Sequence, residues 1–261
     1  MHGTGNDFLM IDNFKKTIIL LPQQITDICK RNFGVGADGV ILVEPGKNGG
    51  DCFMNYINAD GSFAEMCGNG ARCTADFMVR FKNFKNPILN LETYGGIRPV
   101  QILKNHKYTV NMGKPEFAPH PNFPSASKNI GGTDWHFVSM GNPHAVGFFD
   151  SEMTIDEKLE ILGEQIENNT SLFPRKINVN FVAQKGENHF IVKTYERGSG
   201  PTLSCGTGAS ASFSWIIKSK KSCGKIQIDV PGGELFFEYN GQKEILMTGS
   251  SKIVFSGKVE I

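Results

Sequence analysis

The sequence predicts an α/β (α+β) fold of two similar halves, and three observations lead to this prediction. A strand, a glycine-rich turn, a cysteine, Gly-x-Gly and a helix follow one another around Cys67, and the same order returns around Cys205. In both copies a polar residue, Asn58 or Glu196, stands nine positions before the cysteine. The helix after each cysteine is apolar on most faces, which is typical of a helix surrounded by protein. We therefore interpret the chain as two halves that bring Cys67 and Cys205 together.

Apolar runs with glycine or proline boundaries predict the strands of the first half. They cover residues 8–14, 40–43, 53–58, 87–94, 97–103 and 107–112, with a further extended stretch at 17–21 and no leading strand before them. A proline start predicts a short helix over residues 22–32. A longer helix is predicted over residues 71–81, on which Arg72, Asp76 and Arg80 form one polar stripe.

A glycine string between the first helix and the strand at 40–43 matches the Gly-x-Gly-x-x-Gly pattern of dinucleotide-binding turns. It reads Gly34-Val35-Gly36-Ala37-Asp38-Gly39. In a Rossmann turn a strand precedes the glycines and a helix follows them, whereas here the order is reversed. We therefore interpret the string as a structural turn or a wall of the site, and we expect no cofactor.

The second half follows a segment with four prolines, residues 115–124, which is the best candidate linker. Its predicted strands cover residues 135–140, 145–149, 178–183, 190–196, 226–230, 234–239, 245–248 and 252–255. Helices are predicted over residues 154–168 and 209–218, and the second has almost no charge, so we expect it inside a curled sheet. The predicted domains are residues 1–114, rejoined by the last strand at about 250–261, and residues 115–249.

The repeat also includes a turn asparagine early in each half. Gly5-Asn6 and Gly141-Asn142 lie 136 positions apart, and the two cysteines lie 138 apart. Asparagine often does no more than satisfy a tight turn. Its return at nearly the same spacing favours a functional role for Asn6 and Asn142.

The overall charge excludes several classes of partner. Lys plus Arg is 27 against 26 for Asp plus Glu, a net charge of +1, which gives no electrostatic footprint for nucleic acid or an anionic membrane. No apolar run reaches the ~18 residues of a membrane span, and the N-terminus lacks a signal-peptide core. We expect a cytoplasmic protein that acts on a small, roughly neutral or zwitterionic molecule.

Two cysteines at helix N-termini predict a specific chemistry. The helix dipole and free backbone amides favour a thiolate, and the same amides suit a carboxylate. If two such ends face each other across a cleft, one thiolate removes a proton from a carbon next to a carboxylate, and the other thiol returns one to the opposite face. The pattern therefore predicts a racemase or epimerase that uses Cys67 and Cys205.

The other four cysteines are interpreted as structural. Free cysteine is usually a small buried apolar residue, and this interpretation applies to Cys29, Cys52 and Cys223, and to Cys73, which lies six residues into its helix. Without a Cys-x-x-Cys pair we expect no zinc site. Because the cysteines are not densely spaced, we expect thiols in a reducing compartment and no disulfide framework.

A series of motifs extends over nearly the whole chain. They are His2-Gly3-x-Gly5-Asn6-Asp7-Phe8, Gly34-x-Gly36-x-Asp38-Gly39, Asn58 to Cys73, Met140-Gly141-Asn142-Pro143-His144, Phe173-Pro174, Asn178-Val179, Glu196-Arg197-Gly198-x-Gly200 and Cys205-Gly206-Thr207-Gly208. In this order they resemble the diaminopimelate epimerase family. The long stretch around Cys67 is highly specific, whereas the isolated glycine turns are not.

This resemblance implies two pseudo-symmetric domains, each a curled, mostly antiparallel sheet around a central helix, with the active site in the cleft between them. It implies conversion of L,L- to meso-diaminopimelate in lysine and peptidoglycan precursor biosynthesis, without pyridoxal phosphate or metal, and a homodimer whose candidate contact lies near Phe255. Cys67 and Cys205 are then the catalytic pair, and His144 and Glu196 support the reaction. The implied substrate-binding residues are Asn6, Asn58, Gly68, Asn69, Asn142, Asn178, Glu196, Arg197, Gly206 and Thr207.

Three departures from the family pattern stand out: the chain starts at the His-Gly motif without the usual preceding strand, Gly39 stands where part of the family has Gln, and Pro201 stands where Glu is common. Alternatives also remain at this point. A racemase for another amino acid shares the architecture, although Arg197 favours a substrate with a second charged end. A non-catalytic binding module and a thiol–disulfide exchange protein fit the two intact cysteines less well.

Overall fold

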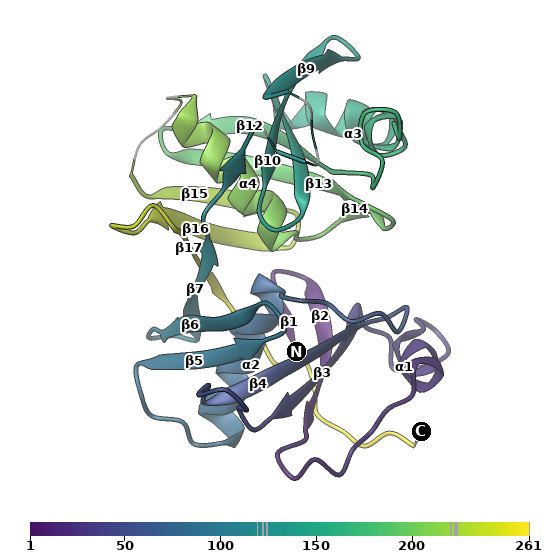
Figure 1. Cartoon of the computed structure of the whole chain (residues 1–261), viewed down its shortest axis with the longest axis vertical. Helices are drawn as coiled ribbons and strands as arrows, with labels where there is room; N and C mark the ends of the chain where they lie inside the picture. The colour runs from purple at the N-terminus through teal and green to yellow at the C-terminus, as the bar shows by residue number, and fades with distance from the viewer. Residues whose placement is uncertain (119, 122, 124, 220, 222–223, 261) are drawn as a thin grey trace. The chain divides into compact units, whose positions relative to one another are not determined.

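The computed structural model describes residues 1–118, 120–121, 123, 125–219, 221 and 224–260, so Cys223 lies outside the described residues. The chain forms two compact units, Met1–Asn111 with Thr248–Ile261, and Met112–Met247. It leaves the first unit within strand β7 (Lys107–Gly113) and returns within strand β17 (Ile245–Ser250) (Figure 1).

The first unit is a mixed sheet that curls around helix α2. Pairing along the sheet is parallel for β2/β3 and β4/β5 and antiparallel for β1/β2, β3/β4, β5/β6 and β6/β7. Helix α2 contacts every strand from β1 to β6, and each of its residues from Gly68 to Met78 is buried. The remaining bounds are β1 (His2–Gly3), β2 (Asn6–Asp12), α1 (Pro22–Cys29), β3 (Gly39–Glu44), β4 (Cys52–Asn58), α2 (Gly68–Phe81), β5 (Ile88–Thr93) and β6 (Gly96–Ile102).

The second unit repeats this pairing around helix α4. β11/β12 and β13/β15 are parallel, and β10/β11, β12/β13 and β15/β16 are antiparallel. Helix α4 contacts β10 to β13 and β15, and α3 packs on β11 to β14. The bounds are β8 (Glu116–Phe117), β9 (Ser127–Ile130), β10 (Thr133–Ser139), β11 (Pro143–Phe149), α3 (Glu152–Glu167), β12 (Asn178–Gly186), β13 (His189–Glu196), β14 (Gly200–Thr202), α4 (Gly206–Lys218), β15 (Ile226–Val230) and β16 (Gly233–Tyr239).

Two of the three residues in the polar stripe of helix α2 are buried, and Arg80 is exposed. Arg72 and Asp76 are both 0% exposed. Asp76 accepts hydrogen bonds from the Tyr108 hydroxyl at 2.6 Å and from Arg80 Nε at 2.8 Å. Because buried charges require such partners, this stripe interacts with the protein interior.

Several predicted elements need correction. Residues 252–255 form no strand; Lys252 makes a single bridge to His2, and Val254 and Phe255 are exposed. The prediction of no leading strand is wrong, because His2 and Gly3 pair with β2 as β1. Residues 17–21 form no strand within the described chain.

The proline-rich segment is not a free linker. Its β8 pairs with β10, and Phe123 is 2% exposed within the core of the second unit. Edge pairing and an apolar anchor thus hold residues that proline content alone predicts to be loose; residues 119, 122 and 124 lie outside the described chain.

A helix glycine gives a test of the packing in the second unit. Gly163 lies in α3 against β13, and a Cβ there would stand 2.5 Å from the Tyr195 ring. Alanine normally stabilises a helix by ~0.5–1 kcal/mol over glycine, but this contact would force the ring or the helix to move. Gly163→Ala should therefore lower the free energy of unfolding by about 1–3 kcal/mol, as measured by denaturant titration.

Gly241→Ala is the matched control, because no atom lies within 4 Å of its added Cβ. It should change the free energy of unfolding by no more than ~0.5 kcal/mol. Equal effects of the two substitutions would contradict the packing of α3 on Tyr195.

Candidate functional site

Cys67 is the N-cap residue of helix α2. Its Sγ accepts a hydrogen bond from the Gly70 amide at 3.4 Å, and its backbone is extended, so the helix begins at Gly68. The sequence analysis predicted that the helix begins three residues later, because glycines in the first turn lower helix propensity. The amides of Gly68 and Asn69 belong to that first turn, where no intrahelical acceptor is available.

Asn6 lies beside Cys67 in the first unit. The thiol donates to Asn6 Oδ1 at 3.7 Å, and Asn69 Nδ2 donates to the same oxygen at 3.2 Å. Asn6 Nδ2 in turn donates to Asp38 at 2.7 Å, and Arg31 pairs with Asp38 at 3.0 Å. Asp38 therefore orients the Asn6 amide, so one residue of the glycine string contacts this candidate site.

Arg72 is a buried cation behind Asn69 that the sequence analysis did not assign to the site. Its Nη2 donates to Asn69 Oδ1 at 2.8 Å and to Thr4 Oγ1 at 3.2 Å. Burial lowers the pKa of Arg72 to about 10, so the group remains charged at neutral pH. In the sequence, the position of Arg72 inside the long motif around Cys67 could have indicated that it belongs near the site.

Asn58 lies at the end of β4, and its side chain engages a local turn. Asn58 Nδ2 donates to Ser62 Oγ at 3.0 Å, and the Asn58 amide donates to the Ser62 carbonyl. Asp60 accepts from the Ser62 hydroxyl at 2.6 Å. Among the site residues predicted in the first unit, hydrogen bonds join Cys67, Asn6 and Asn69, whereas the Asn58 side chain bonds to this turn.

Cys205 caps helix α4 in the same way. Its Sγ accepts from the Gly208 amide at 3.4 Å, and the helix begins at Gly206. The sulfur also lies 3.5 Å from Thr207 Oγ1. The second half therefore repeats the capped cysteine of the first, with Thr207 at the position of Asn69.

Asn142 and His144 continue the contacts of Thr207. Asn142 Nδ2 donates to Thr207 Oγ1 at 3.3 Å, and His144 Nε2 lies 3.0 Å from Asn142 Oδ1. His144 is 0% exposed. Burial and the positive charge of Arg197 lower the pKa of His144 to about 3, so the ring is neutral.

The electrostatic environment of Cys205 favours the protonated thiol. Burial and the nearby Glu196 carboxylate raise the pKa of Cys205 well above its ordinary value. Glu196 is held by a 2.6 Å hydrogen bond from the Thr202 hydroxyl. These two effects oppose the helix dipole, which we expected to favour a thiolate at this position.

Asn178 and Arg197 form a second contact set in this unit. The Arg197 amide donates to Asn178 Oδ1 at 3.0 Å, and Asn178 Nδ2 donates to the Pro143 carbonyl at 3.2 Å. Arg197 Nη1 donates to the Arg175 carbonyl at 3.0 Å. Asn178 thereby links the turn after β13, which contains Arg197, to the start of β11 next to Asn142.

The asparagine turns also repeat in structure. Gly5 and Gly141 have φ values of 86° and 90°, in the left-handed region that favours glycine. Each glycine places the following asparagine at the start of a strand or in the turn before it, near the capped cysteine of its own unit.

The other described cysteines remain thiols. Burial raises the pKa of Cys29 and Cys73 to about 11 and that of Cys52 to about 12. All three are buried. These values agree with their interpretation as structural residues.

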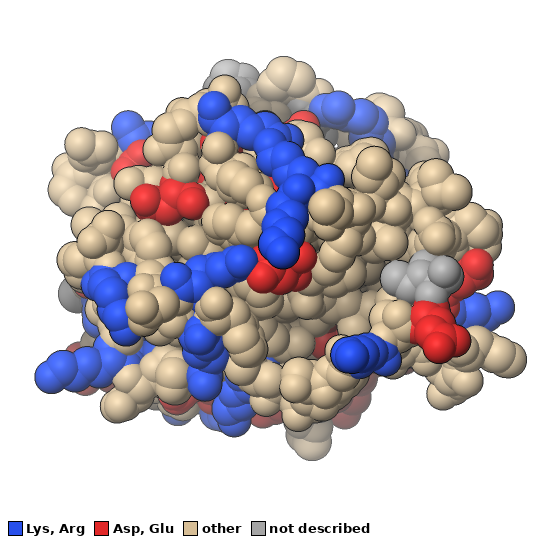
Figure 2. All heavy atoms as spheres, turned by 90° about the horizontal axis from the view of Figure 1, so that it is seen from below, with Lys and Arg blue, Asp and Glu red and all other residues tan. Residues whose placement is uncertain are grey.

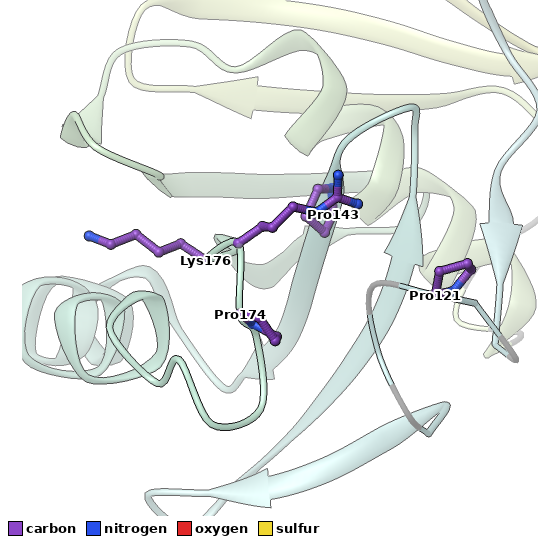
Figure 3. A pocket seen from close by; sticks show the side chains of 5 residues that line it. Pro121, Pro143, Pro174 and Lys176 are labelled. Carbon is purple, nitrogen blue, oxygen red and sulfur yellow. The ribbon is translucent and has the colours of Figure 1, made fainter.

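A cavity of about 90 Å³ lies next to the Asn142–His144 turn. It is lined by Pro121, Pro143, Pro174, Arg175 and Lys176, and the Lys176 side chain points away from the three prolines (Figure 3). Lys176 Nζ instead pairs with Glu167 at 3.1 Å. None of the predicted site residues lines this cavity.

On one face of the molecule, basic and acidic side chains are interspersed among other residues (Figure 2). No helix of the described chain is long and apolar enough to cross a membrane. Within the same residues, no group of three or more His, Cys, Asp and Glu side chains could hold a metal ion.

Comparison with known proteins gives a full-length match. The family profile described as diaminopimelate epimerase matches residues 1–118 and 136–254. A diaminopimelate epimerase of Leptospira biflexa is 40% identical, covering 100% of this chain and 98% of the relative. One from Carboxydothermus hydrogenoformans is 41% identical over 99% and 97%. A chloroplastic relative from Oryza sativa subsp. japonica is 38% identical over 98% and 77%.

Solved structures match the fold at low identity. A Bacillus anthracis phenazine biosynthesis protein of the PhzF family has a TM-score of 0.69 at 16% identity, covering 96% of this chain and 92% of its own. A hydroxyproline epimerase from Agrobacterium vitis, solved with bound trans-4-hydroxy-L-proline, has a TM-score of 0.66 at 15% identity, covering 95% and 86%. These neighbours confirm the predicted two-domain α/β fold.

The two Gly-x-Gly turns should respond differently to the same substitution. A Cβ at Gly208 would lie 2.2 Å from Asn180 Oδ1, whereas one at Gly70 would meet the flexible end of Ile41 at 2.9 Å. Gly208→Ala should lower the free energy of unfolding by about 1–3 kcal/mol, because a buried amide must move. Gly70→Ala should cost less than ~1 kcal/mol; denaturant titration that ranks them in the opposite order would contradict this packing.

Because His144 is buried as the neutral ring, the protein should become less stable as the pH is lowered. From its ordinary pKa of 6.5 down to about 3, His144 takes up a proton in the unfolded chain but not in the folded one. Acid therefore favours unfolding, by about 1.4 kcal/mol per pH unit below 6.5. His144→Phe should lose that much less stability per unit between about pH 6 and pH 4, as measured by denaturant titration at each pH; parallel profiles would contradict it.

Proposed function

Because the chain belongs to the diaminopimelate epimerase family, we propose that Cys67 and Cys205 form the acid–base pair with which it epimerises diaminopimelate. The enzyme is an isomerase of lysine biosynthesis. The observation that carries the two-cysteine assignment is the repeated cap: each sulfur accepts from the third amide of a buried helix, at 3.4 Å in both units.

The proposed reaction moves one proton off the α-carbon and one onto it. The base thiolate takes the α-proton and becomes a thiol, and the electron pair left on carbon is shared with the adjacent carboxylate. The opposite thiol then donates its proton to the other face and becomes the thiolate. Configuration at that carbon inverts, and the proton count of the pair is unchanged.

We assign the proton of the free enzyme to Cys205. Its pKa is raised by burial and by Glu196, so this sulfur is ready to act as the acid. Cys67 is then the base, and it must lose the hydrogen that it donates to Asn6 Oδ1 before it can take the α-proton. In the reverse direction the roles exchange. The asymmetry supplies the one deprotonated and one protonated group that inversion requires.

Backbone and side-chain groups near the cysteines are proposed to hold the substrate. The first-turn amides of Gly68, Asn69, Gly206 and Thr207 would bind the α-carboxylate, because helix N-termini suit anions and stabilise the charge that grows during proton removal. The other polar groups of the substrate would bind Asn6, Asn58, Asn142, Asn178 and Arg197. Arg197 matches the second charged end of diaminopimelate, and His144 and Glu196 support the reacting centre.

This route uses proton transfer alone, so the proposal includes no pyridoxal phosphate and no metal. The product is meso-diaminopimelate formed from the L,L isomer. We further propose that residues 1–114 with 250–261, and residues 115–249, are the two epimerase halves, each of which supplies one cysteine. A cytoplasmic homodimer, with residues near Phe255 as its candidate contact, completes the proposal.

The first test is α-proton exchange. Proton NMR of L,L-diaminopimelate with reduced enzyme in D2O should show loss of the α-proton signal and appearance of the meso isomer. Cys67→Ala and Cys205→Ala should each lower the epimerisation rate by about 10²-fold or more, because each removes one proton-transfer group.

Cys29→Ala is the matched control, because Cys29 is buried in α1 and belongs to no proposed contact. It should retain the wild-type rate per folded molecule. Formation of the meso isomer at the full rate in either Cys67→Ala or Cys205→Ala would exclude the two-thiol assignment, and no exchange by reduced wild type would exclude this substrate.

A further inference from the structure

Asn180 is a buried polar residue beneath the second cysteine turn. It lies in β12, is 0% exposed, and uses its whole side chain in hydrogen bonds. Its Nδ2 lies 3.0 Å from the Ala145 carbonyl and 3.2 Å from His144 Nδ1, and its Oδ1 accepts from Thr194 Oγ1 at 3.1 Å. Neither the sequence motifs nor the proposed substrate contacts include it.

These contacts determine which nitrogen of His144 carries the proton. The Ala145 carbonyl can only accept, so the amide nitrogen of Asn180 must face it. The second hydrogen of the same nitrogen then points to His144 Nδ1, which must be the acceptor. A neutral ring with Nδ1 as acceptor carries its hydrogen on Nε2.

From Nε2 the direction of each following hydrogen bond is determined. His144 Nε2–H donates to Asn142 Oδ1, so Asn142 Nδ2 is free to donate to Thr207 Oγ1. Because Thr207 Oγ1 accepts from Asn142, its own hydrogen can point at Cys205 Sγ, 3.5 Å away. A directed series of hydrogen bonds thus runs from Asn180 to the sulfur.

The first half of the chain shows that the fold itself does not require polar residues at the positions of Asn180 and His144. In the parallel pair β11/β12, Val146 is opposite Asn180, and in the equivalent pair β2/β3, Met10 is opposite Ile41. Ile41 and Asn180 hold the same place, each against the third helix residue after its cysteine, Gly70 or Gly208. An apolar side chain fills this place next to Cys67, whereas an amide fills it next to Cys205.

The position of His144 repeats the contrast. Counted from the turn asparagines, the residue equivalent to His144 is Phe8, which is 2% exposed and stacks edge-on with Tyr56. Burying two polar groups where the other half uses apolar ones costs stability unless every hydrogen bond is made. The second half makes all of these bonds, and they lead to the sulfur.

We propose that Asn180 is a positioning residue for Cys205: it holds His144 as the Nε2–H tautomer and so, through Asn142, directs the Thr207 hydroxyl hydrogen at Sγ. The proposal rests on Cys205 being a proton-transfer group, as proposed above. When Cys205 gives up its proton, the directed hydroxyl stabilises the new thiolate against Glu196 and the surrounding apolar residues. Asn180 touches neither substrate nor sulfur.

The first experiment uses the unaltered enzyme. Long-range ¹H–¹⁵N NMR of the ¹⁵N-histidine-labelled protein should show His144 as the neutral Nε2–H tautomer across about pH 5–8, with His144→Phe to assign the signal. An Nδ1–H tautomer, or a ring that becomes charged within that range, would overturn the proposal. No substitution at Asn180 is needed for this outcome.

The second experiment reverses the donor. Asn180→Asp is nearly isosteric, but its carboxylate accepts from Nδ1–H, so it should shift His144 to the Nδ1–H form. The Asn142 amide then turns over, and the Thr207 hydrogen points to Asn142 instead of sulfur. Alkylation of Cys205 by iodoacetamide at about pH 8, followed by peptide mass spectrometry, should slow about tenfold, as for a one-unit rise of a thiol pKa.

Asn180→Leu separates the loss of the donor from the added charge, and should slow Cys205 in the same direction. Thr194→Val is the matched control: it removes a bond to Asn180 Oδ1 but leaves the donor to His144, so tautomer and Cys205 rate should stay within about twofold of wild type. Cys67, which belongs to the other unit, reports general damage within each variant and should change by less than about twofold.

The outcomes separate this proposal from the proposed function. An unchanged Cys205 rate in a folded Asn180 variant whose tautomer has changed would overturn the positioning role, whatever the substrate. If diaminopimelate is not epimerised but tautomer and thiol rates behave as expected, the positioning role stands and the substrate assignment fails.

Discussion

The structure depends on one interaction that occurs twice, the hydrogen bond from a helix amide to a cysteine sulfur. A helix whose first turn is buried must satisfy amides that have no intrahelical partner, and Cys67 and Cys205 each accept from the third of them. A glycine at that third position lets the neighbouring strand approach. The sheet of each unit can then surround its helix, which places a cysteine sulfur at the N-terminus of a buried helix.

The two halves share this geometry but differ in their electrostatics. Behind Cys67 lie a buried cation, Arg72, and apolar packing from Ile41. The Glu196 carboxylate and the neutral His144 lie behind Cys205. Hydrogen bonds through the Asn142 amide and the Thr207 hydroxyl connect His144 to the sulfur. A duplicated fold thereby presents two chemically unequal thiols, which an inversion with one acid and one base requires.

Local signals predicted most of the fold, and tertiary contacts account for the rest. Periodicity located the four helices and the long strands, but β8, β9 and β14 have two to four residues and depend on a neighbouring strand edge. The repeat identified both cysteines and both turn asparagines. Arg72, Asp38 and Asn180 were missed because their roles arise from side-chain partners distant in sequence; the alternation of Asn178 and Asn180 on one strand was the available signal for the last.

The path of the chain between the units has a consequence for synthesis on the ribosome. The second unit is a continuous segment, Met112–Met247, whereas the first needs Thr248–Ile261 to be complete. Arg72 Nε donates to the Ser250 carbonyl, and the Lys252 and His2 backbones exchange hydrogen bonds. The first unit is therefore completed only after the second unit has been synthesised, and until then Arg72 lacks the Ser250 carbonyl as an acceptor.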